Sequence, residues 1–513
     1  MSDFSVTLQP LALAAFFHHR WRDWRIFCAI SRRLRRGNFG RQCAFVFALY
    51  FFGILGLLLA DVYYADDQFR AVTAQPNFLF SGRYIAEYGS SALSMQKWGV
   101  VLDWSPISQL LAIAILALGS VALARVVTGS RKTDYATLAA ALPLGLAPWF
   151  LANLSYKYDA PFMALAVAVN VLPFLYMRRL ALFVPLSVAA LLVMLTSYQA
   201  ASGMYPLLVL FIAQQRWIRG QRLGRIFMAG VISYAVALLL WRMFWFPPRG
   251  GEVALVGAAE LLTNMKALAA SVRSDIRGST FKHLCLAAAL LFVLHSAYSA
   301  PRGRRAAAGA LALSFCAAGP FLAYGLALFL NPVRFDVRTF CGMGTFLALL
   351  ATGATVGAAP LLKTAGQALA LVLAYNLIII STVYANSLAA QEKYMWFRYT
   401  MMMSDLIRMM PGQVAPATRV AACFEKPMLK GRVLENTEKY LPVLARVHDE
   451  FINIIGAEWN KALHIDYIPD FASLWSANPC QKKCSAPAPL ATYENQLNRI
   501  RQFPDNCWEI YYK

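Results

Sequence analysis

The chain has 513 residues, of which 59% are hydrophobic and only 14% are charged, with a mean hydropathy of +0.50. A composition this apolar excludes a soluble globular protein of this length and predicts an α-helical polytopic membrane protein. The formal net charge of +22 would suit nucleic-acid binding, but the placement of the basic residues argues against that class.

Residues 1–42 are predicted to form a basic cytoplasmic arm. No cleavable signal peptide is evident, because roughly forty mostly polar and basic residues precede the first apolar run. The first membrane span is therefore expected to direct insertion.

Residues 43–385 are predicted to form the membrane domain. A helix needs about 20 mostly apolar residues to cross a hydrocarbon core of about 30 Å. About eleven segments approach this requirement, centred on Phe45 to Ala60, Leu110 to Ala124, Tyr135 to Ala152, Met163 to Tyr176, Leu180 to Leu195, Tyr205 to Gln215, Ile226 to Phe246, Leu284 to Ser299, Ala306 to Leu330, Phe346 to Leu361 and Ala368 to Val383.

The basic residues between these spans fall on one side of the membrane if the spans alternate. They are Arg131 and Lys132, Arg178 and Arg179, the stretch from Arg216 to Arg225, the stretch from Arg302 to Arg305, and Lys363. The positive-inside rule then places this side and the N-terminus in the cytoplasm, and the C-terminus outside. For a bacterial inner membrane, outside means the periplasm.

The first external loop, residues 61–105, is long and rich in aromatic and charged residues. Its start places two adjacent aspartates, Asp66 and Asp67, four and three residues before Arg70. One interpretation is a general base beside an arginine that faces a phosphate. The other, given equal weight, is a helix N-cap followed by a solvated first turn.

Three further polar segments end or begin spans on the same outer side. Lys157 and Asp159 lie in the turn between the third and fourth spans, where they could bind substrate or pair with each other. The fifth span ends with Tyr198-Gln199, for which helix capping is the simpler explanation. Arg334 and Arg338 follow the ninth span at a spacing that suits clamping one phosphate. The convergence of all these features on one face favours function.

Residues 386–513 are predicted to form a small mixed α/β domain in the periplasm. Residues 392–410 suit an amphipathic helix, residues 434–462 a helix, and Arg419 to Phe424 a short strand. This region contains four cysteines, which in an oxidising compartment are candidates for two disulfides: Cys423, Cys480, Cys484 and Cys507. A zinc site at Cys480 and Cys484 is the weaker interpretation, because no second pair has ligand-like spacing.

The chain resembles the bacterial glucosyltransferase family that modifies O-antigen in serotype conversion. The resemblance rests on residues 64–70 with Gly82-Arg83, on Asn153-Leu154-Ser155-Tyr156-Lys157-Tyr158-Asp159, on Tyr198-Gln199, and on Arg334 and Arg338. It implies a bundle like that of the GT-C glycosyltransferases, which use polyprenyl-phosphate sugars and work on the exported face.

The resemblance also implies roles for these residues. Asp66 or Asp67 would deprotonate an acceptor hydroxyl, with the other carboxylate orienting it. Residues that would bind the donor phosphate or the substrates are Arg70, Arg83, Tyr156, Lys157, Asp159, Tyr198, Gln199, Arg334 and Arg338. The partners would be a polyprenyl-phosphate-linked sugar, a glycan acceptor and the lipid bilayer. No cofactor is required by the resemblance, and a divalent metal is an open possibility.

Two other classes compete with a glycosyltransferase. A transporter or flippase of lipid-linked saccharides would place charges in mid-membrane cavities and often shows inverted repeats. Here the charges lie at span ends and no repeat is visible. A membrane acyltransferase would require a histidine base, and His283 alone lies in the outer loops of the membrane domain. The sequence favours the enzyme that transfers a sugar.

Overall fold

The computed structural model describes residues 38–221, 224–246, 254–331, 335–357, 359–409, 419–424, 430–449, 451, 473–477, 488–504 and 507–512. Of the predicted basic arm, residues 1–37 lie outside this described part. The first described helix begins at Phe39, where the apolar run starts.

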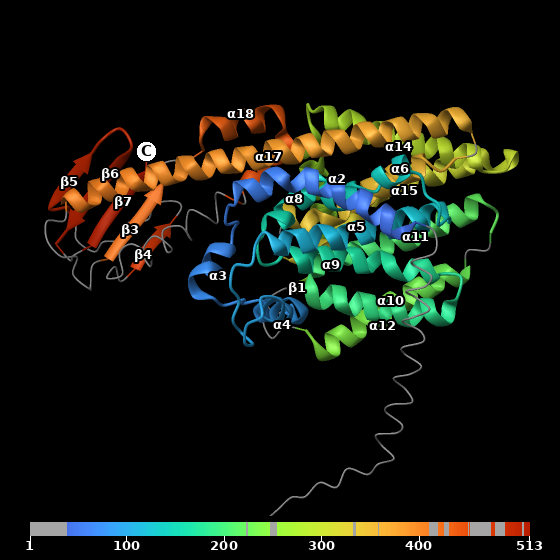
Figure 1. Cartoon of the computed structure of the whole chain (residues 1–513), viewed down its shortest axis with the longest axis horizontal. Helices are drawn as coiled ribbons and strands as arrows, with labels where there is room; N and C mark the ends of the chain where they lie inside the picture. The colour runs from blue at the N-terminus through green and yellow to red at the C-terminus, as the bar shows by residue number, and fades with distance from the viewer. Residues whose placement is uncertain are drawn as a thin grey trace, which may run out of the picture.

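Every predicted span overlaps a helix or a bent helix pair, although the span predicted over Phe346 to Leu361 runs past the end of α16 into the start of α17. In chain order these are α2 (Phe39–Ala60), α5 (Ile107–Thr128), α6 (Tyr135–Ala139) with α7 (Pro143–Leu146) and α8 (Pro148–Ser155), α9 (Ala160–Val171), α10 (Leu180–Ser197), α11 (Met204–Ile218), α12 (Gly224–Phe244), α14 (Thr280–Ser299), α15 (Arg305–Tyr324), α16 (Cys341–Ala354) and α17 (Pro360–Met409). Together they form one helical bundle (Figure 1).

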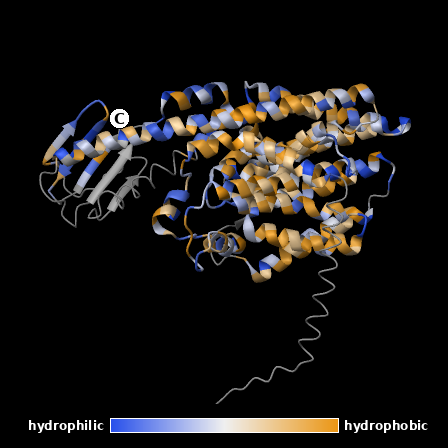
Figure 2. Ribbon diagram, viewed as in Figure 1, coloured by the Kyte–Doolittle hydropathy of each residue, from blue (hydrophilic) through white to orange (hydrophobic). Residues whose placement is uncertain are grey.

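The chain is a membrane protein by the length and apolar character of these helices. Within the described residues, eight helices are long and apolar enough to cross a membrane, or nine if the bent pair counts as one span. The helix over residues 160–176 is apolar but shorter, and α11 has 15 residues. Figure 2 shows hydrophobic residues along the length of the bundle. The count of eleven crossings stays a prediction.

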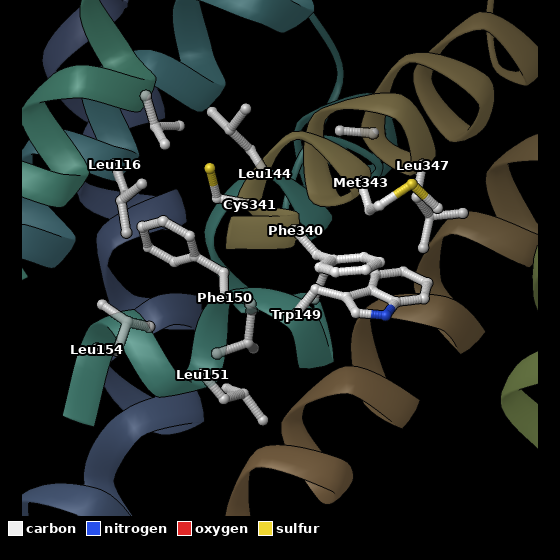
Figure 3. Packing of buried hydrophobic residues seen from close by; sticks show 14 of the residues in the cluster. Leu116, Leu144, Trp149, Phe150, Leu151, Leu154, Phe340, Cys341, Met343 and Leu347 are labelled. Carbon is white, nitrogen blue, oxygen red and sulfur yellow. The ribbon is translucent and has the colours of Figure 1, made fainter. Parts of the chain in front are cut away.

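The bent pair lies at the centre of the bundle. Ala147 adopts an extended conformation and Pro148 begins α8, so the chain turns by 61° between the two halves. Every residue of α7 and α8 is buried. Figure 3 shows Trp149 and Phe150 of α8 packed among side chains of α5, α7 and α16. This core fixes α8, whose C-terminal end leads directly into the predicted Lys157 turn.

The first loop folds into short helices at one end of the bundle (Figure 1). They are α3 (Asp67–Thr73), the 3-10 turn η1 (Leu79–Ser81) and α4 (Tyr84–Leu93). The remaining elements of the bundle are the 19-residue helix α13 (Ala258–Ile276) and the short elements η2 (Leu172–Tyr176), η3 (Gln199–Gly203), β1 (Ala254–Leu255), η5 (Arg302–Arg304), η6 (Gly325–Phe329), β2 (Leu330–Asn331) and η7 (Val337–Phe340). Strands β1 and β2 pair antiparallel and join the long loop before α13 to the end of η6.

The C-terminal region contains the predicted small sheet. Its strands are β3 (Arg419–Phe424), β4 (Ser473–Ala477), β5 (Ala491–Glu494), β6 (Asn498–Phe503) and β7 (Cys507–Tyr512), arranged in the order β4-β3-β7-β6-β5. Strand β3 is parallel to both neighbours, whereas β5, β6 and β7 pair antiparallel. The predicted strand at 419–424 is confirmed. The helix predicted over 434–462 is broken within its described part into α18 (Arg432–Tyr440), η8 (Pro442–Leu444) and a turn of helix that follows.

Helix α17 connects the bundle to the sheet without a break. Its 50 residues span about 75 Å at 1.5 Å per residue, and the amphipathic segment predicted over 392–410 is its final part. One stripe of α17 makes successive hydrogen bonds along its length. These join Tyr384 to Ser155, Ser387 to His448, Gln391 to the Gly431 N–H, Arg398 to the Leu497 carbonyl, and Asp405 to Asn495 and Asn498.

The strand register limits the disulfide pairings. Cys507 is opposite Arg419 on β3, and Cys423 is opposite Tyr511 on β7, so four positions separate the two cysteines along the ladder. At about 3.3 Å per residue this distance is too long for a disulfide between them. The other two candidate cysteines, Cys480 and Cys484, lie outside the described residues, and the two disulfides stay a prediction.

A buried ion pair fastens the C-terminal region to the bundle. The Asp275 carboxylate at the end of α13 accepts hydrogen bonds from the Arg446 guanidinium at 2.9 Å and from the Trp149 indole N–H at 2.8 Å. The guanidinium also lies over the Phe340 ring at 4.3 Å from its centre. Asp275 is almost completely buried, and burial raises the pKa of its carboxyl group.

We expect Arg446→Met to lower the free energy of unfolding by about 3 kcal/mol, because it leaves the Asp275 charge buried without its cation. The double variant Asp275→Asn/Arg446→Met removes both charges and should recover most of this loss. Thermal unfolding of the purified protein in detergent measures both effects. An equal loss in the single and double variants would contradict a role for the ion pair.

Candidate active site

The two adjacent aspartates of the first loop have different surroundings. Ala65 has a positive φ of 51°, which turns the chain so that Asp66 precedes α3 and Asp67 begins it. The Asp66 side chain is 50% exposed, whereas that of Asp67 is 0% exposed. Asp66 occupies the N-cap position of α3, but its side chain does not make the expected N-cap hydrogen bond. Asp67 instead accepts a hydrogen bond from the Lys157 backbone N–H at 2.7 Å, which joins α3 to the turn after α8.

A buried arginine lies among three carboxylates. The Arg70 guanidinium lies 3.8 Å from Asp66, 3.5 Å from Asp67 and 3.2 Å from Asp159. Its Nε also donates to the Pro76 carbonyl at 3.0 Å. The charge of Arg70 therefore holds α3 against the turn that contains Asp159, and neither element could keep its carboxylate buried without it.

Burial raises the pKa of both enclosed carboxyl groups. For Asp67, removal from water raises the pKa well above its ordinary value, Arg70 opposes the shift, and Asp159 adds to it. For Asp159, burial again raises the pKa and the arginines Arg70 and Arg83 oppose it.

Lys157 belongs to a second buried contact with the first loop. Its Nζ donates to Asp61 at 2.6 Å and lies 3.5 Å from Asp103, above the Tyr63 ring at 4.1 Å from its centre. The predicted alternative pairing of Lys157 with Asp159 is replaced by these contacts, because Asp159 pairs with Arg70 and Arg83. Lys157 thus fastens the two ends of the loop to the turn after α8.

Tyr198 positions two other arginines. The Arg83 guanidinium lies over its ring, 4.8 Å from the centre, and 3.9 Å from Asp159. The Tyr198 hydroxyl donates to the Arg338 carbonyl at 2.9 Å. Next to it, the Gln199 amide donates to the Ser81 carbonyl at 2.9 Å, which fastens η1 to the end of α10.

The Arg338 side chain contacts both the turn after α8 and the first loop. It donates to the hydroxyl of the buried Tyr156, and lies 4.0 Å from Asp66 and 3.9 Å from Asp336. Arg334, predicted to act with it on one phosphate, lies outside the described residues. The structure therefore brings together all the predicted site residues that it describes, from four separate segments of the chain.

Exposure divides these residues into two layers. The outer group consists of Asp66, Arg83 and Arg338, with side chains that are 50%, 23% and 21% exposed. The inner group consists of Asp67, Arg70, Lys157 and Asp159, which are almost completely buried. The inner group holds the segments together, and the outer group is the part that a substrate can touch.

Sequence reasoning assigned no role to Asp61, Asp103 or Glu87. The first two hold Lys157, and the Glu87 carboxylate accepts hydrogen bonds from the N–H groups of Phe78 and Leu79 at 2.6 and 3.2 Å. All three are acidic residues in a loop rich in aromatic residues, and this composition could have indicated that the loop is folded. Their partners were distant in the sequence or were backbone groups, and no local pattern identifies such partners.

The carboxylates of the site do not fit a divalent metal ion. Within the part of the chain that the structure describes, no three His, Cys, Asp or Glu side chains form a group that could hold one. The carboxylates face arginines and a lysine, which would repel a cation. The cations of the outer group instead suit an anion such as a phosphate.

Comparison with known proteins agrees with this chemistry. The family described as "Glucosyl transferase GtrII" matches residues 55–351, more than half of the chain. A protein of Salmonella phage P22, described as an uncharacterized 55.3 kDa protein in the gtrB 5′ region, is 27% identical over 157 residues, which are 30% of this chain. The match spans 31% of that relative's length. No solved structure matches the chain. The family match includes the first loop, the Lys157 turn and Arg338.

We expect Glu87→Ala to loosen the turn that presents Arg83. The substitution leaves two backbone N–H groups without their acceptor, at a local cost of about 1–3 kcal/mol. Glu87→Gln keeps an acceptor oxygen and is the matched control. Hydrogen exchange at Phe78 and Leu79 should accelerate strongly in the first variant and little in the second. Unchanged exchange in Glu87→Ala would show that the carboxylate does not hold the turn.

The buried Asp67 predicts a pH dependence of stability. Its folded-state pKa lies above the ordinary value of 3.8, so its contribution to stability is complete below that value and is lost as the pH rises through the folded-state pKa. Asp67→Asn removes the buried charge and keeps an acceptor for the Lys157 N–H. We expect the Tm of this variant, relative to that of the wild type, to rise as the pH increases from the ordinary value of 3.8 through the folded-state pKa of Asp67. A constant difference across this range would contradict the assignment, and Asp66→Asn is the exposed control.

Proposed function

The chain belongs to the GtrII glucosyl transferase family, and we propose that it acts as a membrane glycosyltransferase. From this premise we propose that it transfers a sugar, glucose in the first instance, from a polyprenyl-phosphate donor to a cell-surface glycan such as O-antigen. We place the reaction on the periplasmic face of the bacterial inner membrane, with inversion at the anomeric carbon.

One observation carries the proposal. The half-exposed Asp66 carboxylate lies within 4.0 Å of the guanidinium groups of Arg70 and Arg338 at one end of an apolar helical bundle. A lipid-linked donor reaches such a site laterally from the bilayer, while a polar acceptor arrives from water. In this proposal, the Asp66 carboxylate serves as the acid-base group and the neighbouring arginines as phosphate-binding cations, at a place that both substrates can reach.

The greater exposure of Asp66 supports its role as the general base in this proposal. Its carboxylate is accessible to an acceptor hydroxyl, whereas Asp67 is enclosed by the Lys157 N–H and Arg70. Asp67 is then a positioning residue that holds Arg70 next to Asp66. We propose this division of roles for the two aspartates, between which the sequence left the choice open.

The reaction follows as one displacement. The acceptor oxygen attacks the anomeric carbon as its proton passes to Asp66, and the bond from that carbon to the phosphate oxygen breaks. The electron pair leaves with polyprenyl phosphate. Arg338 and Arg83 face the increasing negative charge on the phosphate, which favours the transition state. Tyr156 and Tyr198 hold these two arginines through the contacts described above.

We expect Asp66→Asn to lower turnover by at least about a hundredfold, because it removes the proton acceptor. Asp67→Asn should retain turnover within about tenfold of the wild type, since it changes only the surroundings of Arg70. The assay follows transfer of labelled sugar from a polyprenyl-phosphate donor to purified O-antigen, with folded protein quantified in parallel. Full activity of Asp66→Asn would exclude it as the base. Movement of labelled donor across vesicles without transfer would identify a flippase instead.

The orientation rests on the positive-inside rule, and cysteine labelling tests it. Gln75→Cys introduces an exposed thiol in the first loop, and Gly303→Cys introduces one at the opposite end of the bundle. With a membrane-impermeant maleimide added from the periplasmic side, we expect labelling at position 75 and protection at position 303. The reverse pattern would place the site in the cytoplasm and remove the basis for a lipid-linked donor.

A further inference from the structure

A cavity of about 470 Å³ lies at the other end of the bundle, far from the candidate active site. It is formed by the end of α5, the segment before α10, the end of α11 and the start of α12. Its lining consists of Val126, Val127, Gly129, Met177, Arg178, Leu180, Ile212, Gln215, Arg216, Arg219, Gln221, Arg225 and Ile226. We call it the arginine pocket.

The arginine pocket and the candidate active site lie at opposite ends of the same helices. Helix α10 begins at Leu180 in the pocket and ends at Ser197, next to Tyr198 of the site. Its 18 residues span about 27 Å, close to the thickness of a hydrocarbon core. The pocket therefore lies at the opposite end of the helical bundle from the site, at a separation that matches the thickness of a hydrocarbon core.

Four arginines surround this cavity and no lining residue is acidic. Arg178 precedes α10, Arg216 and Arg219 end α11, and Arg225 lies in the first turn of α12. Among the described residues, the structure gives none of these arginines a salt bridge to an aspartate or glutamate. Like charges gathered around a cavity repel one another, and an anion bound between them removes that repulsion.

The backbone around the pocket also favours an anion. Helices α10 and α12 both begin there, and the N-terminus of a helix presents unpaired N–H groups and a partial positive charge. No side chain caps the first turn of α10. Because arginine matches phosphate oxygens in pairs, a phosphate group fits this combination better than a carboxylate or a halide ion.

The other half of the lining is apolar. Val126 and Val127 belong to α5 and Ile226 to α12, both long and apolar enough to cross a membrane, and Ile212 belongs to the shorter α11. Met177 and Leu180 also line this part of the cavity. A ligand that contacts both halves has a phosphate head and a hydrocarbon part. We propose that the arginine pocket binds the headgroup of an anionic phospholipid, and that this lipid joins α5, α10, α11 and α12. Two phosphates, as in cardiolipin, would use the four arginines most fully.

Native mass spectrometry of the purified chain in detergent tests this proposal. The probes are cardiolipin, phosphatidylglycerol, neutral phosphatidylcholine and inorganic phosphate. We expect retention of cardiolipin and phosphatidylglycerol in preference to phosphatidylcholine, and a rise in Tm of about 4 °C with cardiolipin. Equal retention of the neutral lipid would overturn the proposal. A shift produced equally by inorganic phosphate would show that the pocket binds free phosphate and would overturn the lipid assignment.

Variants locate the binding site. Arg216→Gln/Arg219→Gln should weaken cardiolipin binding by about thirtyfold, because two arginines near the membrane surface are removed. Arg302→Gln/Lys363→Gln removes the same charge from the same end of the bundle, outside the pocket, and should bind like the wild type. Equal weakening in both variants would show that cardiolipin binding depends on general surface charge. That result would overturn the assignment of the binding site to the arginine pocket. If the first variant does not fold, Arg216→Lys/Arg219→Lys keeps the charge and should lose selectivity for cardiolipin over phosphatidylglycerol.

Discussion

The arrangement of the candidate site depends on one buried cation. Arg70 is almost completely removed from water, and a guanidinium group in that position is stable only if carboxylates surround it. Asp67 and Asp159 supply two of these carboxylates from segments about ninety residues apart. Because each partner would be costly to bury alone, α3 and the turn after α8 are held together. Asp66, Arg83 and Arg338 acquire their positions from this inner contact.

The bundle carries opposite electrostatic characters at its two ends. At one end, aspartates and arginines are interleaved, so their charges largely cancel and a reacting group can be placed among them. At the other end, the arginine pocket has four cations and no acidic lining residue. The first arrangement suits the transfer of a proton beside a bound phosphate, whereas the second suits retention of an anion. Helices α5 and α10 run from one end to the other, so each has one end near the candidate active site and the other end at the arginine pocket.

The sequence predicted the positions of the helices well, because long apolar runs require burial in lipid or in the core. It also predicted which loops converge, since the residues at span ends must share a side of the membrane. It did not predict that Lys157 binds Asp61 and Asp103, or that Arg446 binds Asp275. Such partners lie up to 171 positions apart, and their choice depends on packing that no local pattern records. The sequence also did not predict the unequal exposure of Asp66 and Asp67. Both residues occupy one short, polar stretch, and only packing against distant segments distinguishes them.

Helix α17 sets the relation between the sheet and the rest of the molecule. Its hydrogen-bonding positions, from Tyr384 through Gln391 and Arg398 to Asp405, recur at intervals of seven residues and so stay on nearly one side of the helix. Each residue of an α-helix advances the direction of its side chains by about 100°. Adding or deleting a single residue between Gln391 and Arg398 would therefore turn the sheet away from its present heading. The direction that the C-terminal region faces thus depends on the number of residues in this part of α17, and an insertion of seven residues would nearly preserve it because it completes about two turns.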